Sequence, residues 1–411
     1  MKNIVKLLLF SILTNVTSCS EPVKKEAKKP NIIFVLADDL GYGDISSFNE
    51  NGQIKTTHID QLAADGIKFT DAHTSSAVCT PTRYGIITGR YNWRSRLKSG
   101  VLTGKSKALI PNSRTTVASM LQKQGYNTAF IGKWHLGWDW AVKNKDSVKG
   151  EGWNAKDFGN LDFSKPITNG PKDLGFTYSY GHSGSLDMAP YVYVENGVPT
   201  AIPDTVTVDK GKYTWWRKGP TSKDFIHDDV TPNFFRKTFN YINEKAKADN
   251  PFFLYLALPS PHTPILPTEE WQGKSNLNPY ADFMMLIDAY IGQLTKTLKE
   301  AGIEANTEVF ADHAAGFVAL KSGEIQAYFA DQSILMYNFF AQDMKEDFLF
   351  PEQLLTLEKH GLAMAKGDSD FRLLIDSALS KMFANGTMQK YFEDAFPGAK
   401  PGQATQAMYL L

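Results

Sequence analysis

The sequence predicts an α/β fold, a mixed and mostly parallel sheet flanked by helices. Three apolar runs, at residues 31–37, 127–132 and 252–258, have the pattern of buried parallel strands. Segments of helical pattern alternate with them through about residue 306, as a wound α/β sheet requires. The composition, 42% hydrophobic and 21% charged, is that of a globular protein, and 411 residues exceed one ordinary core.

The elements follow in order along the first half of the chain. The strand at 31–37 stops at Asp38-Asp39, and a tight glycine-rich turn follows. Residues 57–65 fit a helix closed by Gly66, residues 67–70 resemble a strand, and residues 75–90 form a turn that leads into a helix. Residues 113–124 fit a helix that starts with Ser or Thr and ends before Gly125.

The second half continues the alternation after a long interruption. Residues 140–225 are rich in Gly, Pro, Asp and Trp, so we expect long loops around a site. His182 fits an ordinary loop histidine there better than a pocket residue. Residues 231–248 and 280–300 fit helices, the first with Pro232 in its first turn and the second closed by Gly302.

The N-terminus reads as an export signal. Lys2 and Lys6 lie at the start of an apolar stretch that is too short to span a bilayer. The ending Val-Thr-Ser-Cys19 resembles a bacterial lipobox, which implies cleavage before Cys19 and lipidation of its thiol; a secretory signal with an incidental cysteine is the alternative. Residues 1–19 would then be a signal peptide and residues 20–30 a charged linker. We expect an exported protein, periplasmic or held at the outer membrane only by a lipid on Cys19.

Charge and cysteine content exclude several classes of protein. Lysine plus arginine and aspartate plus glutamate both number 44, so nothing in the global charge favours nucleic acid as a partner. Specificity for an anion must come from a local pocket. Only two cysteines are present, and if Cys19 carries lipid, Cys79 has no disulfide partner.

Side chains with catalytic chemistry gather at the ends of the predicted strands. Asp38 and Asp39 follow the first strand, Lys133 and His135 follow the second, and His262 follows the third. Each of these alone also fits a structural role. The specific element is the spacing C-x-P-x-R, from Cys79 to Arg83, which leads into a helix.

Five blocks in order resemble the sulfatase family of the alkaline-phosphatase-like fold, over about residues 30–306. They begin at Asn31, Cys79, Gly132, Ser185 and Ser260, with the sequences NIIFVLADDLGYGD, CTPTRYGIITGR, GKWHLG, SLDM and SPHTP. The resemblance implies that residues 31–306 are a sulfatase catalytic domain. It implies hydrolysis of a sulfate ester, of the arylsulfatase kind, on a sulfated small molecule or carbohydrate.

The resemblance also implies the roles of individual residues. Cys79 would be oxidised to formylglycine by a sulfatase-maturing enzyme, and one oxygen of the hydrated aldehyde would attack sulfur while the other later expels sulfate. Arg83 would orient that nucleophile, Lys133 and His135 would lie near the sulfate, and His262 would protonate the leaving alcohol. The implied cation is one Ca²⁺, with Mg²⁺ as the alternative, held by Asp38, Asp39 and the modified Cys79 side chain.

The resemblance changes after residue 306. The family has a strand that runs into Ser-Asp-Asn-Gly, which completes the metal site, and a lysine further on. This chain reads NTEVFADHAAG from Asn306, which puts Asp312 and His313 at that position, and no matching lysine follows. Asp312 and His313 are therefore the candidates for the second half of the metal site.

Residues 307–411 resemble the end of a periplasmic amino-acid-binding protein, an α/β segment of solute-binding type. By that resemblance Asp331 would contact the α-amino group of a ligand, and the chain would be a chimera. The alternatives to an active sulfatase are thus a sulfatase-like chain without catalysis and an amino-acid-binding module. A phosphate-ester hydrolase of the same fold is disfavoured by Cys79, because phosphatase relatives usually use threonine or serine.

Overall fold

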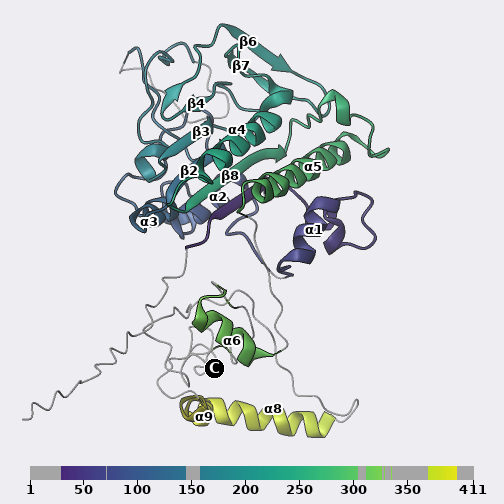
Figure 1. Cartoon of the computed structure of the whole chain (residues 1–411). Coiled ribbons are helices and arrows are strands. Elements are labelled where there is room, and N and C mark those ends of the chain that lie inside the picture. The colour runs from purple at the N-terminus through teal and green to yellow at the C-terminus, as the bar shows by residue number, and fades with distance from the viewer. Residues whose placement is uncertain are drawn as a thin grey trace, which may run out of the picture.

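The computed structural model describes residues 29–70, 72–144, 158–303, 312–325, 328, 335 and 369–395. A six-stranded sheet lies at its centre, in the order β1-β8-β2-β3-β4-β5 (Figure 1). The first four strands of that order are mutually parallel, and β4 and β5 are antiparallel additions at one edge. The strands are β1 (Ile32–Asp38), β2 (Asn127–Lys133), β3 (Tyr178–His182), β4 (Val194–Glu195), β5 (Val198–Pro199) and β8 (Phe252–Pro261).

Helices cover both faces of this sheet because the strand side chains alternate between two apolar cores. In β2, Ala129 and Ile131 face the core shared with α4 (Val230–Lys245) and α5 (Pro279–Glu300). Phe130, between them, faces the core that includes residues of α2 (Cys79–Thr88) and α3 (Val117–Lys123). The sheet flanked by helices that the sequence predicted is confirmed.

The other short elements connect these layers. Helix α1 (Thr57–Asp65) contacts α5, and β6 (Thr205–Asp209) pairs with β7 (Trp216–Thr221) in a separate two-stranded sheet. The 3₁₀ turns are η1 (Tyr42–Asp44), η2 (Ser46–Phe48), η3 (Asn92–Arg94), η5 (Pro171–Leu174), η6 (His227–Asp229) and η7 (Glu269–Trp271).

Several boundaries differ from the expected ones. Residues 67–70 form no strand, and Ile67 and Phe69 are exposed, so the expected strand there is wrong. Helix α3 begins at Val117 rather than near residue 113, because Thr116 and Ser119 form a capping box. Strand β1 is an edge strand of the described sheet, with Phe34 41% exposed, and not the fully buried strand that its apolar run suggested.

The region expected as loops, residues 140–225, contains five of the strands, β3 to β7. The sequence of β3, YSYGH, has no apolar run, and it becomes a strand through pairing with β2 on one side and β4 on the other. Tertiary pairing decides secondary structure here, since strand propensity depends strongly on context.

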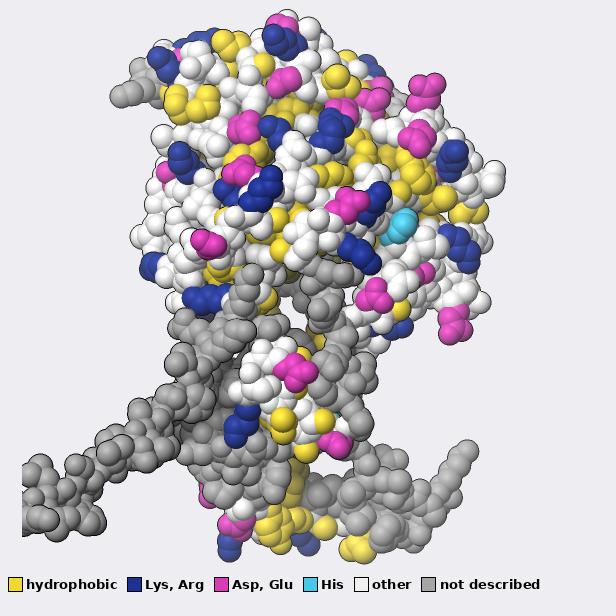
Figure 2. Space-filling view, in the orientation of Figure 1, with side chains coloured by type: hydrophobic (Ala, Val, Ile, Leu, Met, Phe, Trp, Pro, Cys, Tyr) yellow, Lys and Arg dark blue, Asp and Glu magenta, His cyan; other side chains and the backbone are white. Residues whose placement is uncertain are grey.

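The described part of residues 307–411 contains the helices α6 (His313–Ser322), α8 (Ser369–Ala384) and α9 (Thr387–Ala395). Asp331, the expected ligand contact, lies outside the described residues, as do Cys19 and the rest of the expected signal peptide. Among the helices that are described, none combines the length and apolar character that crossing a membrane requires. Acidic and basic side chains are interspersed on the face shown in Figure 2, in line with the equal charge totals.

Candidate active site

The carboxyl ends of four neighbouring parallel strands bring the predicted residues together. Asp38 ends β1, Lys133 ends β2, His182 ends β3, and His262 directly follows β8. These ends lie at one edge of the sheet, where open α/β sheets bind their ligands. The sequence-based expectation that these side chains share one region therefore agrees with the strand topology.

Asp38 is the buried anion of this region. The Lys133 ammonium donates to Asp38 Oδ2, and Arg83 Nη2 lies 3.4 Å from the same oxygen. Burial alone would raise the pKa of the Asp38 carboxyl, but the charges of Lys133 and Arg83 outweigh it and hold the pKa well below its usual range. Asp38 is thus ionised, and two buried cations face it.

Arg83 joins two strands and the helix that carries Cys79. Its guanidinium donates to the Lys133 carbonyl oxygen at 2.6 Å and to the Leu258 carbonyl oxygen at 3.0 Å, and its exposure is 1%. Because Arg83 lies one helical turn after Cys79 on α2, these bonds fix the start of that helix against β2 and β8. The planar guanidinium, with its fixed fork of donors, suits this arrangement.

Cys79 is the first residue of α2, with Val78 as the N-cap, and its thiol is unpaired. Burial raises the pKa of the Cys79 thiol, but a hydrogen bond with His262 and the charge of Lys133 lower it overall. The pKa of His262 shifts in the opposite direction. Burial lowers the pKa of His262, but its interaction with Cys79 raises it overall. The two side chains form a coupled pair in which each favours the charged form of the other.

Ser185 also belongs to this site, although the sequence analysis gave it no role. Its hydroxyl oxygen accepts a hydrogen bond from Lys133 Nζ at 3.0 Å and lies 3.5 Å from His262 Nδ1. It is 1% exposed. The signal that pointed to it was its place in the block SLDM, one of the five that resemble the sulfatase family.

His135 lies close to the nucleophile segment through its backbone. The Thr80 hydroxyl donates to the His135 carbonyl oxygen at 2.9 Å, and His135 Nε2 donates to the Leu102 carbonyl oxygen at 2.7 Å. Its Nδ1 has no partner among the described residues. Burial, together with the charge of Lys133, places the pKa of His135 well below its usual value, so the ring is neutral.

His182 differs from the loop histidine that the sequence suggested. It ends β3, is 2% exposed, and stacks on Phe234 with an interplanar angle of 13°. Burial lowers the pKa of His182 to about 3. Its strand pairs with β2 at Lys133, so the ring is a buried neighbour of the site.

The predicted metal ligands are only partly brought together. Asp39 has a left-handed backbone, φ 63°, and its Oδ2 lies 3.6 Å from His262 Nε2. Asp312 instead caps α6, accepting from the Ala315 amide at 2.8 Å, and His313 Nδ1 lies 2.8 Å from the Tyr328 hydroxyl. Helix α6 lies away from the central sheet in Figure 1.

Within the described parts of the chain, no three His, Cys, Asp or Glu side chains are arranged to hold a metal ion. Asp38 and Asp39 offer hard oxygen donors, but Ca²⁺ takes six to eight oxygen ligands. The donor set described here therefore falls short of a complete site. The metal role of Asp312 and His313 stays a prediction, and no catalytic step is assigned to the ion.

The fold and the site define a class, namely α/β proteins that gather a nucleophile and several cations at the carboxyl ends of parallel strands. The sulfatase family model matches residues 30–335, past the predicted domain end at residue 306. The chain therefore belongs to the sulfatase family. Members of this family generally use a formylglycine nucleophile and a divalent cation.

Individual relatives agree with this membership. An N-acetylgalactosamine-6-O-sulfatase of Bacteroides thetaiotaomicron is 32% identical over 344 residues, which cover 75% of this chain and 64% of that protein. Human arylsulfatase A is 30% identical over 69% of this chain and 51% of its own length. A solved Bacteroides thetaiotaomicron protein, described under the metabolism of multiple glycosaminoglycans, is 30% identical over 68% of this chain and 61% of that one, with a TM-score of 0.57. The chain thus spans about half to two thirds of the relatives it matches.

Proposed function

We propose that this protein hydrolyses sulfate esters through Cys79 matured to formylglycine. One observation carries the proposal: Arg83 holds the start of α2, where Cys79 lies, against β2 and β8, the strands whose ends carry Lys133 and His262. A nucleophile there has a proton-transfer partner and a cation beside it, as transfer of a charged sulfuryl group requires. The hydrated aldehyde would supply the two geminal oxygens needed for attack and for release.

The residues around Cys79 have separable roles in this proposal. Lys133, which contacts Asp38 and Ser185, would bind a sulfate oxygen, and such a preorganised cation is worth roughly 3 kcal/mol in a transition state. His262, whose pKa is raised overall, is the donor of a proton to the leaving alcohol. Asp38 and Asp39 would supply some of the ligands of Ca²⁺ or, alternatively, Mg²⁺, and such a cation supplies Lewis-acid chemistry when it is bound.

We further propose a sulfated carbohydrate as the substrate, with 6-sulfated N-acetylgalactosamine as the first compound to test. The support is the relative of that specificity, which is the most similar in sequence of those named above. We also propose that the protein is exported and lipid-anchored at Cys19, and that a sulfatase-maturing enzyme is its partner. The amino-acid-binding role of residues 307–411 stays a prediction. It would be wrong if no polar amino acid in a panel raised the unfolding temperature of the protein.

The test begins with mass spectrometry of the tryptic peptide that contains residue 79, from protein made together with a maturing enzyme. We expect the mass of an aldehyde in place of the thiol, a loss of sulfur and two hydrogens and a gain of oxygen. The matured protein should then hydrolyse an aryl sulfate, and Cys79→Ala should abolish turnover. An unmodified thiol in fully active protein would overturn the proposal.

A second variant separates attack from release. Unmodified Cys79→Ser has one oxygen, so it can attack sulfur but cannot eliminate sulfate by re-forming an aldehyde. We expect at most one equivalent of alcohol per enzyme, followed by arrest. The competing reading, a sulfatase-like chain without catalysis, predicts neither turnover nor this single event, and calcium titration by calorimetry would show no binding.

A further inference from the structure

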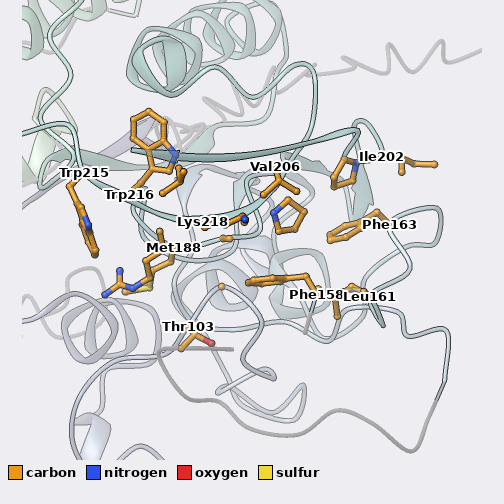
Figure 3. Close-up of a pocket in the computed structure, with 18 of the residues that line it drawn as sticks. Thr103, Phe158, Leu161, Phe163, Met188, Ile202, Val206, Trp215, Trp216 and Lys218 are labelled. Carbon is orange, nitrogen blue, oxygen red and sulfur yellow. The ribbon is translucent and has the colours of Figure 1, made fainter. Parts of the chain in front are cut away.

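A pocket of about 820 Å³ lies against the β6–β7 hairpin, and the catalytic residues described above do not line it. The β6–β7 hairpin forms one wall, and the segment at residues 158–163 forms another. Figure 3 shows Trp215 and Met188 at one end and Phe163 and Ile202 at the other, with Lys218 between them. The volume is that of a site for a small ligand or one to two sugar units.

The pocket is lined mostly by apolar side chains, and the charged side chains that line it are all positive. Its charged members are Lys143, Lys210, Arg217 and Lys218, and no Asp or Glu is among the described residues that line it. Asp187 neutralises Arg217, whose guanidinium also lies 4.7 Å from the Trp215 ring. None of the ion pairs among the described residues involves Lys210 or Lys218, so their charge is available to an anion.

The pocket is built on the same segments that hold the catalytic groups. Met188 lines it three residues after Ser185, which contacts Lys133 and His262. On the other side Thr103 lines it, next to Leu102, whose carbonyl accepts from His135. The pocket and the catalytic site therefore share two backbone segments, one that carries Ser185 and Met188 and one that carries Leu102 and Thr103.

We propose that this pocket binds a further anionic sugar unit of the substrate, next to the unit that carries the scissile sulfate. The inference rests on the proposed function and narrows its substrate class to oligosaccharides with more than one acidic group. The apolar face of a pyranose packs on aromatic rings such as Trp215 and Phe158, while carboxylate or sulfate groups meet Lys210 and Lys218. Apolar surface with isolated cations fits this chemistry better than it fits a neutral lipid or an aryl group.

The experiment measures binding in the Cys79→Ala background, so it does not depend on turnover. The probes are N-acetylgalactosamine 6-sulfate and a chondroitin 6-sulfate tetrasaccharide, compared by calorimetry. We expect the tetrasaccharide to bind at least about tenfold more tightly than the monosaccharide. Lys210→Glu/Lys218→Glu should remove that advantage, since two reversed exposed charges shift affinity by about tenfold. The loss should shrink at high salt.

Two controls test separately whether the position of the lysines and the charge of the ligand matter. Lys247→Glu reverses an exposed lysine that lines none of the described pockets, and the advantage of the tetrasaccharide should remain. A carboxyl-reduced tetrasaccharide should bind more weakly than the parent. Equal affinity for the monosaccharide and the tetrasaccharide, or an advantage that survives the double reversal or carboxyl reduction, would overturn the proposal. An enzyme inactive on every sulfate ester would instead refute the proposed function.

Discussion

At the scale of single residues, Arg83 has the most demanding environment in the site. It is fully buried, donates to carbonyl oxygens on two strands, and faces the Asp38 carboxylate. Arg83→Lys keeps the charge, but one ammonium cannot reach both carbonyls and Asp38 together. We expect a loss of about 3 kcal/mol in the free energy of unfolding, measured by urea denaturation, because buried polar groups are left unpaired.

An exposed arginine gives the matched control for that change. Arg236 makes two hydrogen bonds to Asp229, and its side chain is 51% exposed. Arg236→Lys should cost less than about 1 kcal/mol, as for other surface ion pairs. Equal losses for the two substitutions would mean that the buried contacts of Arg83 add little to stability.

Catalytic residues that belong to a recognisable motif could be predicted from the sequence. Residues whose role depends on their position in the folded protein could not. Cys79 and Arg83 could be found from their spacing, and Lys133 and His262 from their positions after apolar strands. Ser185 begins one of the five blocks, but its contact with Lys133 is seen only in the fold. His182 could not be assigned because its strand, β3, forms only by pairing with β2.

At the scale of elements, the approach of β2 to β8 positions Lys133. Gly132 precedes that lysine at φ 131°, and a Cβ there would lie 2.0 Å from the Ala257 carbonyl oxygen on β8. Long apolar runs predicted these two strands, since a buried parallel strand needs little else. The close contact is invisible in the sequence, because a glycine by itself does not say what it touches.

Gly132→Ala should therefore separate the ends of β2 and β8 and displace Lys133. We expect a loss of at least about 3 kcal/mol in stability, or failure to fold, since the overlap is with backbone and the conformation is unfavourable for alanine. Gly125→Ala is the control: its φ is also positive, at 85°, but a Cβ there has open space around it. Thermal unfolding that is equal for both variants would contradict the argument.

At the scale of the whole molecule, the two cores enclose several histidines that are neutral. His135, His182 and His227 are 0%, 2% and 8% exposed. Burial lowers the pKa of His227 to about 4 and that of His182 to about 3, from an ordinary value of 6.5. An interior that excludes water penalises the protonated rings, so the fold as a whole becomes sensitive to acid.

The sign of this sensitivity follows from proton binding. Between about pH 6.5 and pH 4 the unfolded chain protonates His227 while the folded chain does not, so acid favours unfolding and stability rises with pH across that window. Each such group contributes at most about 1.4 kcal/mol per pH unit.

Replacing His227 by phenylalanine tests this argument. His227→Phe keeps an aromatic ring beside Trp216, where the two ring centroids lie 3.9 Å apart, but removes the group that titrates. Urea unfolding from about pH 7.5 to about pH 5 should show a shallower pH dependence for this variant than for the unaltered protein. If His227→Phe leaves the slope unchanged, the buried ring is not a source of the acid sensitivity.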